Sequence, residues 1–219
     1  MLLTTGFMMM NKKCKDIVDY FNTILKDARC ELNYTKDYEL LIAVMLSAQT
    51  TDKSVNKVTS VLFNKYQTLD ELNNASLDDI CDIIKPIGLY KNKAINLKEI
   101  VKSLINDYDY KVPREKEELV KLKGVGVKTA NVVRIEIFKE SEFPVDTHVN
   151  RIAKRLGFAN EKDDVAKVEE KLKKQFPKDL HAKLHHQFIH FGRYYCMAKN
   201  PKCEGCVLSK YCNFIKKKY

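Results

Sequence analysis

The last 24 residues contain four cysteines, and no other feature of the sequence restricts the fold more strongly. Six, two and five residues separate them, along a turn-rich segment with Asn200, Pro201 and Gly205. A Cys-x-x-Cys pair brings two sulfurs to one side, and the longer spacers let the outer two approach the same point. The spacing therefore predicts one metal centre, either a structural zinc ion or an iron–sulfur cluster. The predicted ligands are Cys196, Cys203, Cys206 and Cys212.

The remaining cysteines do not favour a disulfide framework. Cys14, Cys30 and Cys81 lie in apolar stretches, and a total of seven cysteines is odd. Nothing in the sequence is typical of a secreted protein. Residues 1–10 are apolar, but no positive charge precedes them and no small-residue cleavage site follows, so we predict a loose tail and not a signal peptide.

The charge balance of the chain suits a polyanionic partner. Lys and Arg number 39 against 29 Asp and Glu, which gives a net charge of +10. A lysine-rich background composition would give the same value, so charge alone does not decide for nucleic acid. No apolar run is long enough to span a bilayer, and we predict no membrane location.

The periodicity of apolar residues predicts helices throughout. They recur at helical spacing in residues 17–25, 55–66 and 95–105, and no segment shows sustained strand alternation. Residues 40–46 are apolar on every side, which indicates a helix buried in the middle of the fold. Ser76 with Asp79 indicates a capping box, and Asp163 or Asp164 precedes another helix. We predict an all-α fold of about ten short helices, with a boundary at residues 140–144.

Two segments repeat a turn between helices. Residues 122–127 (LKGVGV) align with residues 84–89 (IKPIGL), and the helices predicted after them cover residues 128–138 and 90–106. We interpret both as helix-hairpin-helix turns. Gly124 and Gly126 allow positive φ, so that backbone amides can face a phosphate, whereas Pro86 removes an amide from the first turn. The alternative is that both turns only connect helices.

These motifs together resemble the endonuclease III family of helix-hairpin-helix DNA glycosylases. The resemblance covers residues 40–52, 87–90, 122–133 and 145–149 and the four cysteines, in the family's order, and Lys128 stands 18 residues before Asp146 as the family pattern requires. It implies a [4Fe-4S] cluster in place of zinc and a two-lobed fold with a DNA cleft between the lobes. A six-helix barrel with the hairpin would occupy residues 30–140, and a cluster lobe would combine residues 1–29 with 141–219.

The resemblance also implies an activity in base-excision DNA repair. The enzyme would be a DNA N-glycosylase and abasic-site lyase that removes oxidised pyrimidines, such as thymine glycol, from duplex DNA. Lys128 is the implied nucleophile, forming a Schiff base at C1′ that undergoes β-elimination. Burial, cationic neighbours and its helix N-terminus are expected to favour its neutral amine. Asp146 is expected to stabilise positive charge on the sugar, although an Asp here also suits an N-cap.

Base excision requires extrusion of the target nucleotide, which leaves a gap in the stack. The resemblance implies that Gln49 and Leu89 fill it. The second hairpin would bind the DNA backbone through a set of consecutive residues. These are Gly124, Val125, Gly126, Lys128 and Thr129. Four basic residues near the cysteines predict a further basic loop facing DNA. These are Arg193, Lys199, Lys202 and Lys210.

The expected partner is double-stranded DNA with a damaged pyrimidine or an abasic site, bound by a monomer. The expected location is the cytoplasm, on chromosomal DNA, for a prokaryotic protein, and the nucleus or mitochondrion otherwise. His186 and His190 lie four apart without the intervening Glu of zinc proteases, so we predict no second metal site.

Two other functions compete with this one. Adenine-mismatch glycosylases share the implied fold and cluster, but they lack the hairpin lysine and carry an extra C-terminal domain. A non-catalytic DNA-binding module would use the hairpin for grip and the metal for stability. Lys128 together with Asp146 distinguishes the predicted enzyme from both.

Overall fold

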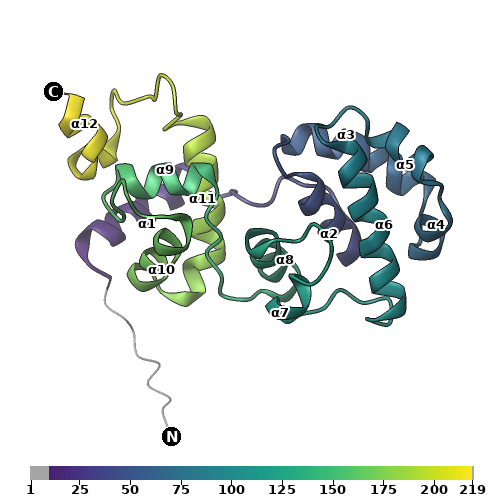
Figure 1. Cartoon of the computed structure of the whole chain (residues 1–219). Helices are drawn as coiled ribbons and strands as arrows, with labels where there is room; N and C mark the ends of the chain where they lie inside the picture. The colour runs from purple at the N-terminus through teal and green to yellow at the C-terminus, as the bar shows by residue number, and fades with distance from the viewer. Residues whose placement is uncertain (1–9, 219) are drawn as a thin grey trace, which may run out of the picture. The chain divides into compact units, whose positions relative to one another are not determined.

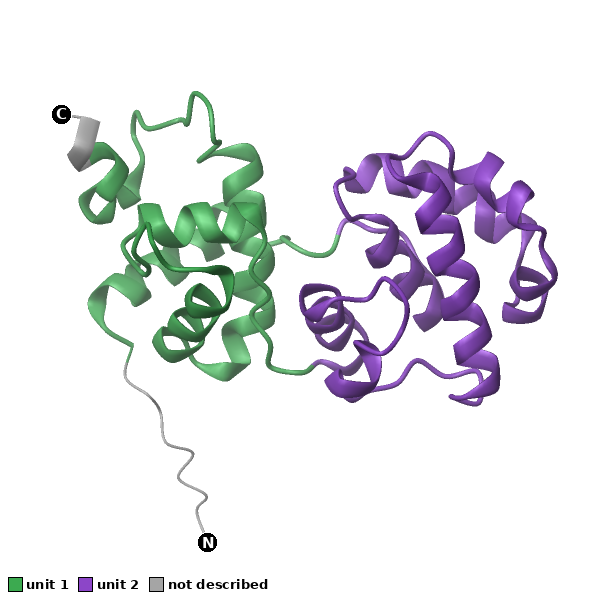
Figure 2. Cartoon of the chain, in the orientation of Figure 1, with its two compact units in different colours: residues 1–30, 140–219 green, residues 31–139 purple. Residues whose placement is uncertain are grey.

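The computed structural model describes residues 10–218, with side chains to residue 215, so the predicted tail lies almost wholly outside the described residues. The described chain contains twelve α-helices, two short 3-10 helices and no strand, as the apolar periodicity predicted (Figure 1). It divides into two compact units, shown in Figure 2. Unit 1 joins residues 1–30 to residues 140–219, and unit 2 is the continuous segment 31–139.

Unit 2 contains seven helices. They are α2 (Asp37–Leu46), α3 (Asp52–Lys65), α4 (Leu69–Asn74), α5 (Leu77–Ile84), α6 (Tyr90–Asn106), α7 (Lys116–Leu119) and α8 (Val127–Phe138). Helix α2 is its centre, because it packs against α3, α6 and α8. Every side chain from Glu39 to Leu46 is buried, which confirms the prediction of a helix enclosed on all sides. Each buried Leu or Ile contributes roughly 1.5–3 kcal/mol to folding.

The only carboxylate in the buried part of α2 is satisfied locally. Glu39 Oε2 accepts hydrogen bonds from the amide of Thr35 at 2.7 Å and from its hydroxyl at 2.9 Å. The amide of Lys36, the N-cap, donates to the same oxygen at 3.2 Å, and backbone amides at this end of a helix have no helical partner. Glu39 therefore fixes the first turn of α2 and allows a charged side chain to lie in the core.

Unit 1 is built from both ends of the described chain. Its helices are α1 (Lys12–Ile24), α9 (Thr147–Arg155), α10 (Val165–Gln175), η1 (Lys178–Leu180), α11 (His181–Tyr194), η2 (Val207–Tyr211) and α12 (Asn213–Lys218). Phe188 of α11 lies at the centre of its core, with edge-on rings of Phe21, Phe143 and Phe176 at 5.4, 5.7 and 6.2 Å between centroids. Since Phe21 belongs to α1, this cluster joins the N-terminal helix to the C-terminal half of the chain.

Helices α9 and α11 approach each other closely at a glycine. A Cβ atom on Gly192 would lie 2.9 Å from Cβ of His148, which is inside van der Waals contact. The contact brings the start of α9, which carries Asp146 as its N-cap, against α11. Any larger residue at position 192 would push this end of α9 away.

Candidate functional site

The turn between α7 and α8 has the geometry that the glycine pattern predicted. Gly124 adopts φ +78°, in the left-handed region that favours glycine. The amide of Val125 donates to the carbonyl of Leu122 at 3.1 Å and closes the turn. Gly126 is the N-cap of α8 and has no side chain to satisfy the amides of the first turn. Those amides can therefore bind an anion, whereas the Val125 amide is already used inside the turn.

Lys128 is the second residue of α8 and is exposed. It makes no ion pair with any described residue, unlike many lysines of this chain. The predicted burial of Lys128 is wrong, because the residue lies exposed at the start of α8.

Asp146 is the N-cap of α9, as its sequence context indicated. Its Oδ1 accepts a hydrogen bond from the amide of Val149 at 2.8 Å, and the residue is half-buried. Asp146 belongs to unit 1 and Lys128 to unit 2. The second carboxylate oxygen is not needed for the cap, so the same side chain can serve a second partner.

Burial lowers the pKa of His148, which follows Asp146 by two residues on α9. The nearby Asp146 carboxylate opposes this shift, and the Arg151 guanidinium adds to it. His148 is therefore neutral near pH 7, and its Nδ1 lies 3.3 Å from Nη2 of Arg151.

Gln49 and Leu89 share an unusual backbone conformation. Gln49 has φ +55° and Leu89 has φ +60°, and both lie in unit 2. Both side chains are exposed, and Leu89 presents 60% of its surface. A non-glycine residue in the left-handed region is uncommon and is retained only where its surroundings fix it. The structure thus presents both candidate gap-filling side chains outward on constrained backbone.

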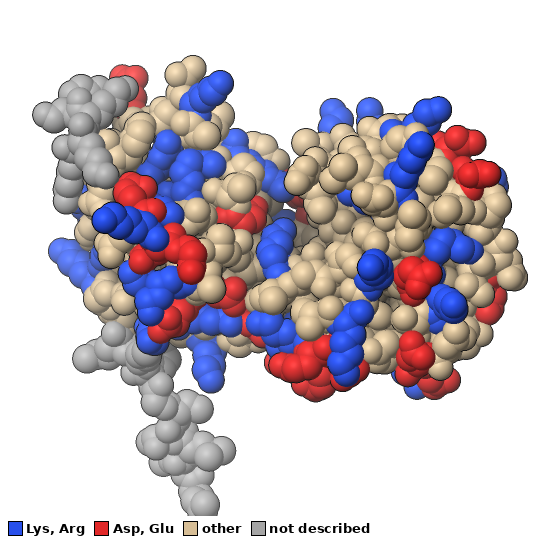
Figure 3. Space-filling model, viewed as in Figure 1, with Lys and Arg blue, Asp and Glu red and all other residues tan. Residues whose placement is uncertain are grey.

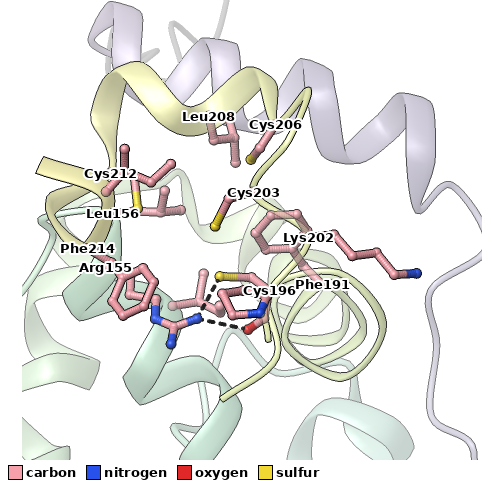
Figure 4. A pocket seen from close by; sticks show the side chains of 13 residues that line it. Arg155, Leu156, Phe191, Cys196, Lys202, Cys203, Cys206, Leu208, Cys212 and Phe214 are labelled. Carbon is pink, nitrogen blue, oxygen red and sulfur yellow. Dashed lines mark hydrogen bonds between the residues drawn. The ribbon is translucent and has the colours of Figure 1, made fainter. Parts of the chain in front are cut away.

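The four C-terminal cysteines line one pocket of unit 1 (Figure 4). The rest of its wall is mainly apolar and includes Leu156, Phe191 and Leu208. No group of three or more His, Cys, Asp or Glu side chains between residues 10 and 215 is arranged around a single ion. The four thiols instead face the pocket from different sides.

Burial raises the pKa of the Cys196 and Cys206 thiols, because an apolar pocket disfavours thiolate anions. A positively charged metal group in the pocket would reverse this preference, since coordinated thiols are deprotonated. A four-cysteine donor set in apolar surroundings therefore fits an iron–sulfur cluster chemically.

Two arginines of α9 hold the first cysteine. Arg155 Nη1 donates to Sγ of Cys196 at 3.1 Å (Figure 4). The same nitrogen donates to the carbonyl of Met197 at 2.8 Å. Arg151 Nη2 donates to the carbonyls of Gly192 at 2.7 Å and Cys196 at 3.2 Å. The sequence analysis did not identify this pair. Residues four apart on a helix lie on the same face, so the spacing of Arg151 and Arg155 could have indicated that they bind the same segment.

Two of the basic residues near the cysteines have partners within the protein. Lys210 donates to the Asp16 carboxylate of α1 at 2.6 Å, and Tyr211 donates to the same oxygen at 2.7 Å. Lys202 lies over the ring of Tyr195 at 5.6 Å. Lys210 of the predicted basic loop is therefore exposed but paired with an acidic side chain far away in sequence.

Two further histidines of α11, near His186 and His190, have structural contacts. His181 and His185 are each 2% exposed. One ring nitrogen of His181 lies 2.9 Å from the carbonyl of Phe176, and one of His185 lies 2.8 Å from the carbonyl of Pro144. These contacts anchor the loops on either side of α9 and α10.

The surface carries both signs of charge. On the face shown in Figure 3, lysine and arginine side chains occur over both units with acidic side chains interspersed. Within the described residues, no helix is long and apolar enough to cross a membrane.

Comparison with known sequence families gives two matches. The profile of the HhH-GPD superfamily of base excision DNA repair proteins matches residues 42–178. The profile of the iron-sulfur binding domain of endonuclease III matches residues 196–212, which span all four cysteines. The second match decides between the two metal centres that the spacing left open, and the chain carries a [4Fe-4S] cluster.

Individual relatives agree over nearly the whole chain. Endonuclease III of Bacillus subtilis (strain 168) is 44% identical over 201 residues, which cover 92% of each chain. Endonuclease III of Escherichia coli (strain K12) is 41% identical over 187 residues, 85% of this chain and 88% of that one.

Solved structures give the same result. A non-covalent endonuclease III–DNA complex aligns with a TM-score of 0.91 at 44% identity, over 96% of this chain and 99% of that one. A trapped covalent endonuclease III–DNA intermediate aligns with a TM-score of 0.89 at 45% identity, over 95% and 99% of the two chains. This chain therefore belongs to the endonuclease III family, within the HhH-GPD superfamily of base excision DNA repair proteins.

Proposed function

We propose that this protein removes oxidised pyrimidines, such as thymine glycol, from duplex DNA and then nicks the abasic strand, with Lys128 as the nucleophile and Asp146 as the carboxylate that stabilises positive charge on the sugar. Family membership supports the general chemistry of glycosylase and lyase. The observation that carries the assignment is an exposed lysine without an ion pair, two residues after the glycine N-cap of α8. A phosphate bound by the first-turn amides would bring the adjoining sugar near the Lys128 amine.

The neutral Lys128 amine attacks C1′ of the damaged nucleotide, and the C1′–N bond breaks with its electron pair leaving on the base. The base takes up a proton, and opening of the sugar ring gives a protonated imine between Nζ and C1′. Loss of the C2′ proton then expels the 3′ phosphate and breaks the C3′–O bond. Hydrolysis of the imine returns the amine and leaves a nicked strand.

Asp146 supports the first step. Departure of the base places positive charge on the sugar, and a carboxylate stabilises that charge when it faces C1′. The hydrogen bond from the Val149 amide restrains one oxygen of Asp146 and leaves the other for this role.

Binding to the backbone involves few side chains. We assign the phosphate contact to the amides at Gly124 and Gly126 and to the first turn of α8, including Lys128 and Thr129. Val125 contributes by packing, because its amide closes the turn and its side chain is 5% exposed. These contacts depend on geometry and not on base identity, so they bind DNA without reading its sequence.

Gln49 and Leu89 complete the DNA contacts. Extrusion of the damaged nucleotide leaves unstacked neighbours and an unpaired base. An amide side chain can hydrogen-bond to the unpaired base, and an apolar side chain can wedge beside it. Gln49 and Leu89 are exposed and conformationally constrained, as such roles require.

We assign the ligands of the [4Fe-4S] cluster to the four pocket-lining cysteines, Cys196, Cys203, Cys206 and Cys212. When bound, the cluster supplies four iron–thiolate bonds that tie the C-terminal segment together. The Arg155 guanidinium donates to the Cys196 sulfur and so stabilises its thiolate form. In this proposal the cluster has a structural role.

We further propose that the protein acts as a monomer on the chromosomal DNA of a bacterial cytoplasm. The relatives described above come from bacteria, which supports this location. The substrate class rests on the same family relationship, and neither profile specifies a damaged base.

Borohydride trapping tests the proposal directly. An imine between an enzyme amine and C1′ is reduced to a stable link, so wild-type protein should be captured on thymine-glycol duplex. Lys128→Gln should bind this duplex but give no adduct and no nick. Asp146→Asn should keep the amine and should be impaired more on thymine glycol than on a preformed abasic site. Adduct formation by Lys128→Gln would show that another amine is the nucleophile.

A further inference from the structure

A buried lysine of α6 contacts the segment that carries Gln49. Lys93 is 4% exposed, although it is the fourth residue of a helix whose other lysines are half-buried or exposed. Its Nζ donates to the carbonyl of Ala48 at 2.8 Å and to Oγ1 of Thr50 at 2.9 Å. These acceptors stand on either side of Gln49, more than forty residues away in sequence.

This contact fixes a strained backbone. Gln49 has φ +55°, a conformation that costs a non-glycine residue about 1 kcal/mol or more. Only the carbonyl before Gln49 and the hydroxyl after it are bound by the ammonium, so the Gln49 side chain stays free to point outward. The lysine thus holds the backbone on both sides without contacting the side chain that would enter DNA.

The same residue also contacts the second gap-filling candidate. The amide of Lys93 donates to the carbonyl of Leu89 at 3.0 Å in the first turn of α6. Leu89 is the N-cap of that helix, with φ +60°. Lys93 therefore joins the Gln49 segment through its side chain and the Leu89 segment through its main chain.

Burial of the Lys93 ammonium group lowers the free energy of unfolding. Lys93 has only neutral acceptors, without a carboxylate, and burial lowers its pKa. An apolar side chain of the same length would avoid the desolvation of an ammonium group. A role in stability alone therefore does not account for lysine at this site.

We propose that Lys93 is a positioning residue that sets the separation and direction of Gln49 and Leu89 as they enter the DNA stack. The inference rests on the gap-filling roles proposed above. Lys93 does not touch the reacting atoms, and it acts through the segment from Ala48 to Thr50. Its loss should slow the steps that need an extruded nucleotide, and it should spare the chemistry of an abasic site that is already accessible.

The test is a double-mutant cycle between Lys93→Met and Gln49→Ala, measured as single-turnover base excision on thymine-glycol duplex. Lys93→Met keeps the length of the side chain and removes its donors. We expect each single variant to slow excision by about 10- to 100-fold, and the double variant to be little slower than Gln49→Ala alone. Nicking of an abasic site in single-stranded DNA, which has no stack to fill, should remain within about twofold of wild type.

Lys91→Met is the matched control, because Lys91 lies on the same helix and is exposed. It should leave excision unchanged. If Lys93→Met does not fold, Thr50→Val removes one of the two acceptors and should give a smaller effect of the same kind. Thermal unfolding and iron content should be measured for every variant.

The outcomes separate the two proposals. Multiplicative effects in the cycle would show that Lys93 does not act through Gln49, and they would overturn this inference while leaving the proposed function intact. Unchanged duplex excision by Gln49→Ala would overturn the gap-filling role itself and this inference with it. Equal losses by Lys93→Met on duplex and single-stranded abasic DNA would indicate a general structural defect and would also overturn the inference.

Discussion

Asn96 of α6 lies directly against the α-carbon of Gly124 in the turn between α7 and α8. A Cβ atom added to Gly124 would lie 2.5 Å from Nδ2 of Asn96. The turn that we propose to bind DNA is therefore seated on α6, the helix that also carries Lys93.

Gly124→Ala should destabilise unit 2 by about 1–3 kcal/mol, because it combines a left-handed φ with a steric conflict. The double variant with Asn96→Ala should recover only the steric part. Gly126→Ala is the control, since φ is ordinary and no atom lies within 4 Å of the added carbon. Chemical denaturation measures the difference, and equal stability of Gly124→Ala and Gly126→Ala would contradict this account.

Arg155→Met should weaken retention of the cluster. It removes the donor to Cys196 Sγ and the bonds to the carbonyls that follow, for a loss of about 2 kcal/mol. Iron release to a chelator, followed by visible absorbance, should be faster than in wild type. Lys199→Met removes a nearby exposed charge without these contacts and should behave as wild type. Indistinguishable release rates for Arg155→Met and Lys199→Met would rule out the proposed anchoring.

Asp16→Asn should loosen the contact between α1 and η2 in a pH-dependent way. Hydrogen bonds from Lys210 and Tyr211 hold the pKa of Asp16 below its ordinary value of 3.8. A lowered folded-state pKa stabilises the fold above pH 3.8, and this contribution disappears as the pH falls through the folded-state value. The stability difference between wild type and Asp16→Asn should thus be largest near neutral pH and should narrow below pH 4. Asp19→Asn, an exposed change on the same helix without the Lys210 and Tyr211 contacts, is the control.

His148 gives a second pH dependence at a higher range. Its pKa is lowered by burial, so the unfolded chain binds a proton more readily than the folded one. Its contribution to stability is complete above pH 6.5 and decreases as the pH falls below that value. His148→Asn should therefore flatten the stability profile of unit 1 as the pH falls below 6.5. An unchanged slope in this window would show that another group titrates there.

Affinity for undamaged duplex should decrease steeply with salt. The proposed contacts are amides and cationic side chains on phosphates, and binding releases counterions. Neutralisation of roughly five phosphates gives a slope of about −4 to −5 in log K against log salt concentration. Fluorescence anisotropy between about 50 and 300 mM salt measures this slope. A flat salt profile would show that apolar contacts dominate binding.

Features that depend on neighbouring residues were predictable from the sequence. The helix after the first hairpin spans residues 90–106 as predicted, and Asp146 and Asp164 cap their helices. Ser76 also caps α5, but Asp79 does not complete the capping box, because its carboxylate pairs with Lys65 at 2.6 Å. There a tertiary ion pair replaces the local contact.

Features that depend on distant residues were not predictable. Helix α6 contains four lysines, and nothing in their spacing marks Lys93 as the buried one. Its partners lie in a loop between two other helices. Asp16 and Lys210 are 194 residues apart, and their ion pair exists only because both chain ends meet in unit 1. The exposure of Lys128 likewise depends on packing that the hairpin motif does not specify.

The composition of unit 1 from both chain ends has a consequence for synthesis on the ribosome. Unit 2 has its entire sequence once residue 139 has emerged, and it can begin to fold at that stage. Helix α1 is synthesised before unit 2, but its Phe21 can pack only after Phe188 of α11 has been synthesised. A nascent chain therefore carries α1 with its apolar face uncovered through most of translation. Premature termination after unit 2 would leave that face exposed to aggregation or to chaperones.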